Sequence, residues 1–202
     1  MKLAIMTKST FFVEEDKILA ALFEEGMDTL HLYKPGSSPM YSERLLSLLP
    51  ANTLDKIIVH EHFYLKNEYS LAAIHLDNPV GGLPIGYKGR FGLSCNNLSQ
   101  LKTMKKQANY VILKNIFDCI EFKDEKSNFS LPELEEAARQ RLIDKKVWAM
   151  GGMTIDNVKM AKDLGFGGVV VCGDLWNRFN IQSQIDYKDI ITHFERLRKA
   201  VE

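Results

Sequence analysis

The sequence has no excess of charge of either sign. It contains 26 Lys and Arg residues and 26 Asp and Glu residues, which gives a formal net charge of +0 at pH 7. Domains that bind nucleic acid are usually basic, because lysine and arginine neutralise the phosphate backbone. The balanced charge therefore argues against nucleic acid as a partner.

Cysteine is scarce as well, with Cys95, Cys119 and Cys172 as its three occurrences. Three widely spaced cysteines cannot build a disulfide framework, and the sequence has no CxxC pair that could bind zinc. No apolar run approaches the ~20 residues of a membrane-spanning helix, and the first residues lack the features of a secretory signal peptide. We therefore expect a reduced, cytoplasmic protein that does not contact a membrane.

Eight short runs of aliphatic and β-branched residues recur along the chain, and helix-like segments separate most of them. Several runs, such as KIIV, YVIL and GVVV, are apolar throughout, which is typical of strands buried on both faces of a parallel sheet. The predicted strands span residues 3–6, 29–33, 56–59, 72–76, 91–94, 110–113, 147–149 and 168–172.

The separating segments carry helix signals. In the last one, apolar residues fall three or four positions apart and form a single stripe: Ile190, Phe194, Leu197 and Val201. Thr154 is the predicted N-cap of another helix, with Gly165 at its C-terminal end. Asn96 or Asn97 is expected to cap a helix that follows the fifth strand.

Eight strand–helix units in 202 residues predict a single-domain (β/α)8 barrel, or TIM barrel, over residues 1–202. The 46% hydrophobic content is enough for a substantial core. The sequence signal for a strand–helix unit is weakest in units three and four, because their connecting segments are short or rich in glycine and proline. An open, doubly wound sheet is the alternative, and in both architectures ligands bind at the carboxyl ends of the strands.

Four of the five histidines fall at or near predicted strand ends: His31, His60, His62 and His75. Any one of them could instead be a packed, hydrogen-bonded core residue, so their clustering is the informative feature. The His60-Glu61-His62 spacing does not match HExxH, which makes a transition-metal site the weaker interpretation. Glu61 and Asp77 are the better candidates for Mg²⁺, because hard cations prefer carboxylates; each could also be a solvated loop residue.

A second candidate site follows the seventh and eighth strands. The seventh strand ends in Gly151-Gly152 before a capped helix, and the eighth ends in Cys172-Gly173. Glycines allow the backbone to approach a ligand, and a helix N-terminus offers free N–H groups to an anion. Loops at these positions commonly bind phosphate in (β/α)8 enzymes, although such glycines can also serve only to make tight turns.

These segments resemble the thiamine-phosphate synthase/TenI family. The motifs that carry the resemblance are WAMGGMTIDNV (148–158) and GFGGVVVCGDLW (165–176), supported in register by IHLD (74–77), GLSCNN (92–97) and NYVILKNIFD (109–118). The resemblance implies a barrel that takes a small phosphorylated substrate and pairs as a homodimer. In family synthases, hydroxymethylpyrimidine diphosphate loses pyrophosphate with the help of Mg²⁺, and the nitrogen of thiazole phosphate attacks the methylene carbon.

The sequence departs from the family pattern on the diphosphate side. The strand-two motif Q-x-R-x-K reads here as HLYKP (31–35), so both cationic positions are lost, while His-Glu-His at 60–62 replaces N-D-R. The position of the second Mg²⁺ aspartate aligns with Val80, with Asp77 close by. Ser94 is kept, whereas the strand-five histidine aligns with Asn96. The loop after strand six differs, with Lys123 near the expected lysine.

The strand-seven and strand-eight glycines are kept, which favours binding of thiazole phosphate over departure of the diphosphate. TenI-type thiazole tautomerases need acid–base groups and no diphosphate site, but their strand-six histidine aligns here with Asn115. A non-catalytic thiazole-phosphate-binding barrel is the third hypothesis. The expected site residues are His31, His60, His75 and Ser94 for catalysis, Gly151, Gly152, Cys172 and Gly173 for phosphate, Tyr33, Lys34, Asn115 and Lys123 for substrate, and Glu61 and Asp77 for Mg²⁺.

Overall fold

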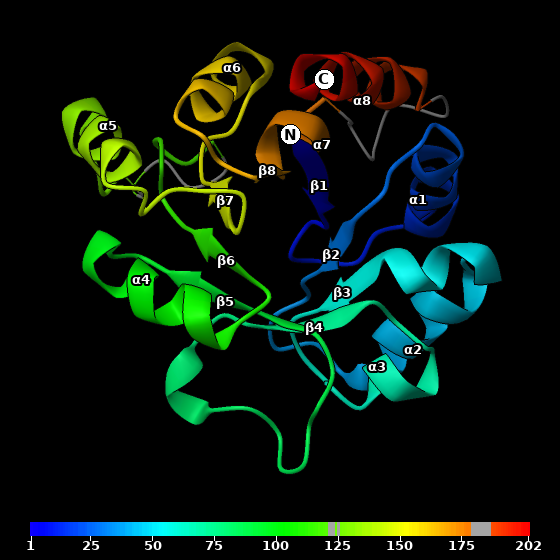
Figure 1. Cartoon of the computed structure of the whole chain (residues 1–202). Coiled ribbons are helices and arrows are strands. Elements are labelled where there is room, and N and C mark those ends of the chain that lie inside the picture. Colours follow the sequence, from blue (N-terminus) through cyan, green and yellow to red (C-terminus); the bar gives the residue numbers. More distant parts are fainter. Residues whose placement is uncertain (121–123, 125, 179–186) are drawn as a thin grey trace.

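The chain folds into a closed barrel of eight parallel strands, paired in sequence order from β1 to β8 and back to β1 (Figure 1). This computed structural model describes residues 1–120, 124, 126–178 and 187–202. The strands are β1 (Lys2–Met6), β2 (Leu30–Leu32), β3 (Ile57–Val59), β4 (Ala73–Leu76), β5 (Phe91–Cys95), β6 (Tyr110–Leu113), β7 (Val147–Met150) and β8 (Gly168–Val171). All eight predicted strands are confirmed within one or two residues, and so is the barrel.

Helices surround the strands on the outside of the barrel (Figure 1). They are α1 (Glu15–Glu24), α2 (Pro39–Leu48), α3 (Leu65–Glu68), α4 (Leu98–Gln107), α5 (Leu131–Arg139), α6 (Ile155–Asp163), α7 (Gly173–Trp176) and α8 (Lys188–Val201), with 3₁₀ turns η1 (Ala51–Lys56) and η2 (Pro79–Gly81). Asn97 caps α4 by accepting from the Ser99 amide, as predicted. None of the described helices is long and apolar enough to cross a bilayer.

The third and fourth units are the weak ones, as the sequence indicates. Helix α3 has a single turn, and β4 is followed by η2 rather than by an α-helix. The other units bury one face of a full helix against the barrel. In α8 the predicted stripe of Ile190, Phe194, Leu197 and Val201 is buried, and the amino group of Met1 donates to the carbonyl of Val201.

Two large aromatic side chains fill the amino-terminal end of the barrel interior. Tyr110 on β6 faces Gly92 on β5, and Trp148 on β7 faces Gly168 on β8. A Cβ atom on Gly92 would lie 2.2 Å from the Tyr110 ring, and one on Gly168 would lie 2.6 Å from the Trp148 ring. The glycines therefore make room for the aromatic rings. The two rings close the amino-terminal end of the barrel interior, and the polar residues of the barrel lie next to them on the carboxyl-terminal side.

Candidate active site at the carboxyl end of the barrel

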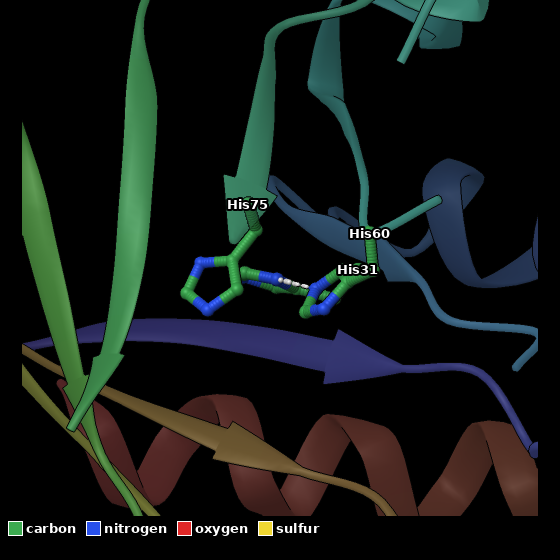
Figure 2. A group of neighbouring side chains, drawn as sticks. All are labelled: His31, His60 and His75. Carbon is green, nitrogen blue, oxygen red and sulfur yellow. Dashed lines mark hydrogen bonds between the residues drawn. The ribbon is translucent and has the colours of Figure 1, made fainter. Parts of the chain in front are cut away.

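Three histidines from adjacent strands converge inside the barrel (Figure 2), and the ring of His31 lies 6.1 Å from that of Tyr110 and 6.5 Å from that of Trp148. His31 comes from β2, His75 from β4, and His60 directly follows β3. His31 and His75 are fully buried, and His60 is 5% exposed. Because side chains alternate along a strand, His60 shares the inward face with Ile58. Of the three, His60 lies nearest the barrel mouth, although its side chain is fully buried.

A continuous hydrogen-bond network joins these histidines to Asp77, the residue that follows β4. Nδ1 of His60 lies 2.6 Å from Oδ2 of Asp77, and Nδ1 of His31 lies 2.9 Å from Nε2 of His60. On the other side, the hydroxyl of Ser94 donates to Oδ1 of Asp77 and lies 2.9 Å from Nε2 of His75. Two branches of the network therefore meet at one carboxylate.

The carboxylate fixes the direction of these hydrogen bonds. An ionised carboxylate only accepts, so Nδ1–H of His60 donates to Asp77. The hydroxyl hydrogen of Ser94 is given to Asp77, so Ser94 accepts from Nε2–H of His75. Nδ1 of His75 must in turn accept from the hydroxyl of Tyr110, 3.0 Å away. The donors of His60, Ser94, His75 and Tyr110 are thus all directed toward Asp77.

Electrostatics keeps this arrangement in one protonation state. Burial alone would raise the pKa of Asp77, but the hydrogen bond and charge of His60, with the charge of Lys114, bring it well below its usual range. Burial lowers the pKa of both His31 and His75 well below the ordinary value, and His60 lowers both further. At neutral pH the site holds one fixed negative charge and two neutral imidazoles.

Asp77 lies at the barrel mouth with two further charged residues. The ammonium of Lys114, directly after β6, is 3.7 Å from Oδ1 of Asp77, and both side chains are about 30% exposed. Glu61, directly after His60, has its pKa raised by burial and by the charge of Asp77, while the Lys34 amide hydrogen bond to Oε2 opposes this. The two carboxylates repel each other, so the donor set of Glu61 and Asp77 fits a hard divalent cation such as Mg²⁺.

The structure does not bring Lys34 to this mouth. Its side chain is 1% exposed, and its ammonium binds Oε1 of Glu15 on α1 and the carbonyl of Thr10. Tyr33 does lie beside the site, with its ring 5.4 Å from that of His60 and its backbone held by the hydroxyl of Thr7. The roles of Tyr33 and Lys34 in substrate binding stay predictions, and the burial of Lys34 speaks against a direct contact.

The glycine turn after β7 packs closely against the loop after β6. Gly151 and Gly152 have φ values of +101° and +60°, and a Cβ atom on Gly152 would lie 2.3 Å from the carbonyl oxygen of Asp118. The amide of Phe117 donates to the carbonyl of Gly151. The glycines are therefore needed for chain packing, whether or not they also contact phosphate.

Pairing of β7 with β8 places this turn next to Cys172 and Gly173. Met150, before the turn, is registered with Val170, two residues before Cys172. Thr154 and Asn157 form a capping box at the start of α6, as predicted for Thr154. Asn115 follows Lys114 with a φ of +58° and leads into the loop against which the turn packs. Lys123 lies outside the described residues, so its expected substrate contact stays a prediction.

Comparison with known proteins identifies the family of this barrel. The model for thiamine monophosphate synthase (TMP-TENI) matches residues 57–175. A thiamine phosphate pyrophosphorylase from Bacteroides thetaiotaomicron is 46% identical, with a TM-score of 0.90 over 99% of this chain and 97% of that one. The chain belongs to the thiamine monophosphate synthase/TenI family. Among the curated proteins, none matches it.

More distant similarities show the barrel fold of this family member. A thiamine phosphate pyrophosphorylase from Pyrococcus furiosus has a TM-score of 0.75 at 18% identity, over 99% of this chain and 95% of that one. A 3-hexulose-6-phosphate synthase has a TM-score of 0.65 at 14% identity and covers both chains fully. At these identities the likeness concerns architecture, so the chemistry of the site rests on its own residues.

Sequence reasoning missed two members of the site in this thiamine-phosphate-synthase-like barrel. Lys114 directly follows the apolar run YVIL, and a cation at the end of a buried strand was the signal that could have indicated it. Tyr110 begins the same run, where its apolar neighbours make it resemble an ordinary core aromatic. Its hydrogen bond to His75 depends on the closure of the barrel.

Proposed function

We propose that this protein is a transferase of the thiamine-phosphate synthase type. It would join hydroxymethylpyrimidine diphosphate to thiazole phosphate and release pyrophosphate. The observation that carries the proposal is the ion pair of Asp77 with Lys114 at the barrel mouth, with the charge of Glu61 nearby and the glycine turn of β7 packed against Asn115, the residue after Lys114. This layout places a cation and two carboxylates beside the turn, and membership of the family supports the reaction.

The thiazole phosphate would bind at the β7 and β8 side. Backbone N–H groups near Gly151, Gly152, Cys172 and Gly173 can approach a phosphate closely, because glycine brings no side chain between backbone and ligand. The N-terminal end of α6 adds a favourable dipole for an anion. Binding there would hold the thiazole ring over the barrel centre, with its nitrogen directed toward the second substrate.

The diphosphate would bind at the β3, β4 and β6 side. During the reaction the bond between the pyrimidine methylene carbon and the diphosphate oxygen breaks, and its electron pair leaves with pyrophosphate. The lone pair of the thiazole nitrogen forms the new C–N bond. Lys114 would neutralise the leaving oxygen, and Mg²⁺ held by Glu61 and Asp77 would supply further positive charge to the diphosphate.

Part of the expected cationic side is absent from this chain. Tyr33 and Pro35 occupy the cationic positions of the strand-two motif, and Lys34 is buried in a pair with Glu15. A lost charge contact to a leaving group commonly costs a few kcal/mol of transition-state stabilisation, or about 10²–10³ in rate. We therefore expect slow condensation that depends strongly on Lys114.

A second candidate function is the tautomerase reaction of TenI-type proteins, in which thiazole phosphate is the sole substrate. The observation that favours it is the network of His60, Asp77, Ser94 and His75, since two positioned acid–base groups are what a proton shift within one ring requires. Asp77 is the member nearest the mouth and positions His60 and Ser94, which would exchange protons with the ring. A non-catalytic thiazole-phosphate-binding barrel is the remaining possibility.

One experiment separates these functions. The purified protein is incubated with both substrates, with and without Mg²⁺, and separately with the non-aromatic thiazole phosphate tautomer. Formation of thiamine phosphate that requires Mg²⁺ is the expected result. Turnover of the tautomer alone would assign the tautomerase reaction instead, and binding without turnover would leave a non-catalytic barrel.

A further inference from the structure

We propose that His31, His60 and His75, here called the histidine cluster, form a binding site for a divalent transition metal of the zinc class. The site is distinct from the carboxylate pair Glu61 and Asp77, and its existence does not depend on the proposed activity. Each histidine offers one ring nitrogen, and these three atoms lie within 4.8 Å of one another. The three rings come from adjacent strands and lie side by side, and those of His31 and His60 are joined by a hydrogen bond (Figure 2).

The distances within the cluster are close to those of a coordination sphere. Nδ1 of His31 and Nε2 of His60 are 2.9 Å apart, whereas two nitrogens bound to one tetrahedral zinc at ~2.0–2.1 Å are about 3.3 Å apart. A metal would therefore replace the hydrogen shared by these two atoms, with a small widening of the distance between them. A hydrogen held on Nδ1 of His31 would move to Nε2 of the same ring. The ring centre of His75 is 4.5 Å from that of His60, so a modest rotation of His75 completes a three-nitrogen set.

The outer hydrogen bonds of the cluster match those of metal-bound histidines. A ligating histidine usually donates its second ring N–H to a carboxylate, a carbonyl or another oxygen, which fixes the ring and increases its basicity. Nδ1 of His60 faces Oδ2 of Asp77, and Nδ1 of His75 faces the hydroxyl oxygen of Tyr110. Nε2 of His60 is therefore left for the metal, and Nε2 of His75 becomes available once its hydrogen bond to Ser94 is given up. For His75, the hydrogen would move from Nε2 to Nδ1, with no net release of a proton.

One nitrogen of the cluster is also left without a partner. Nε2 of His31 is buried and makes no hydrogen bond in the described part of the chain. Buried polar atoms are generally satisfied, and exceptions point to a bound group or a functional constraint. A metal at Nδ1 of His31 would not touch this atom; Nε2 is where the ring would carry its hydrogen when Nδ1 binds the metal.

The donor set indicates the class of metal. Imidazole nitrogens suit zinc, copper, nickel and iron, whereas Mg²⁺ and Ca²⁺ prefer oxygen. Three histidines without a fourth protein ligand are typical of a site that keeps one position open for water or substrate. Ser94, whose hydroxyl lies 2.9 Å from Nε2 of His75, borders that position. Such a metal would place a Lewis acid below the substrate pocket.

The test is metal binding by the full chain without substrates. Chelator-treated protein is titrated with Zn²⁺ in competition with a chromophoric chelator, and with Co²⁺ to record its visible absorption. We expect one ion per chain and a Co²⁺ spectrum of tetrahedral type. In H31Q, H60Q and H75Q the affinity should fall at least tenfold, and D77N should weaken it by about 10–100-fold through the outer hydrogen bond.

The matched control is H62Q. His62 lies two residues from His60 but donates to the carbonyl of Ser37, outside the cluster, so its loss should leave Zn²⁺ affinity unchanged. If the cluster variants do not fold, the ligands of Zn²⁺ can be identified by X-ray absorption spectroscopy on the unaltered protein. We expect three imidazole ligands. Absence of stoichiometric binding, or binding that H62Q abolishes and the cluster variants retain, would overturn the proposal. None of these outcomes bears on thiamine phosphate formation, so the two proposals fail independently.

Discussion

The Nδ1 atom of His60 lies 2.6 Å from Oδ2 of Asp77, at the point where the buried network of the barrel reaches the mouth. This contact and the hydrogen bond from Ser94 occupy both carboxylate oxygens. Asp77 therefore connects three functions of the site: it anchors His60, holds Ser94 and presents negative charge beside Lys114. The first prediction concerns this residue.

Replacing Asp77 with asparagine should lower thiamine phosphate formation by about 10²-fold or more, since an ordered charge in a catalytic site is worth roughly 2.7–4 kcal/mol. The amide cannot accept from His60 and Ser94 as a carboxylate does. Steady-state rates with both substrates and Mg²⁺ measure the effect. D163N serves as the comparison, because Asp163 is exposed at the end of α6 and has no part in the proposed site. Equal rates for D77N and the unaltered protein would remove Asp77 from the proposed site.

Two lysines that are close in chemistry should behave in opposite ways. In K114M the turnover number should drop while the free energy of unfolding stays within about 0.5 kcal/mol, because the side chain is partly exposed. K34M should instead destabilise the fold by about 3–5 kcal/mol, because it leaves the carboxylate of Glu15 buried without its partner. Urea unfolding and kinetics on both variants check this, and a reversed pattern would show that Lys34 is the functional cation.

Lys114 and Lys34 also show which features of the structure can be predicted from the sequence. The eight strands were predictable because a strand buried on both faces is apolar throughout, and the capped helices were predictable from local signals. A lysine directly after the second strand is predicted to be a substrate cation. Its buried partner Glu15 lies in a helix 19 residues earlier along the chain, and no sequence pattern indicates that the two side chains meet. Closure of the barrel decides which charges meet, and no local pattern contains that information.

The histidines illustrate the same limit. Alternation along a strand allows His31 and His75 to face either the barrel interior or the surrounding helices. The choice follows from the registers of β2 to β5, which together place His75 beside both Tyr110 and Ser94. The clustering of histidines near strand ends was visible in the sequence, but the convergence of their bonds on Asp77 was not.

Stability should fall as the pH drops below about 6.5. His31 and His75 stay neutral in the fold, because burial lowers their pKa, whereas in the unfolded chain they take up protons below their ordinary pKa. The unfolded state then binds more protons, which costs up to about 1.4 kcal/mol per pH unit for each histidine. Urea unfolding from pH 8 to pH 5 measures the slope.

The control for this slope is H31Q, which removes one of the two buried histidines. Burial also raises the pKa of Glu15 to about 6, which acts in the opposite direction between about pH 6 and pH 4.5. The difference between the two proteins isolates the histidine, since Glu15 is unchanged in both. Parallel pH profiles for H31Q and the unaltered protein would contradict the assignment of a neutral, buried His31.

The turn after β7 should not tolerate a side chain at Gly152. In G152A the new methyl group would press on the carbonyl of Asp118, and the positive φ adds backbone strain, for a loss of about 1–3 kcal/mol. G165A is the matched control, because Gly165 also has a positive φ but has open space around its Cβ position. Equal losses in the two variants would mean that close packing against the β6 loop contributes nothing.

Every function proposed for the barrel requires thiazole phosphate at its mouth, so a crystal structure with that compound bound is the most direct test. We predict its phosphate between the turns at 151–152 and 172–173, with the thiazole ring facing His60 and Asp77. Density for the phosphate elsewhere on the molecule, or no binding at concentrations that saturate a family synthase, would contradict the proposed site and all three functions built on it.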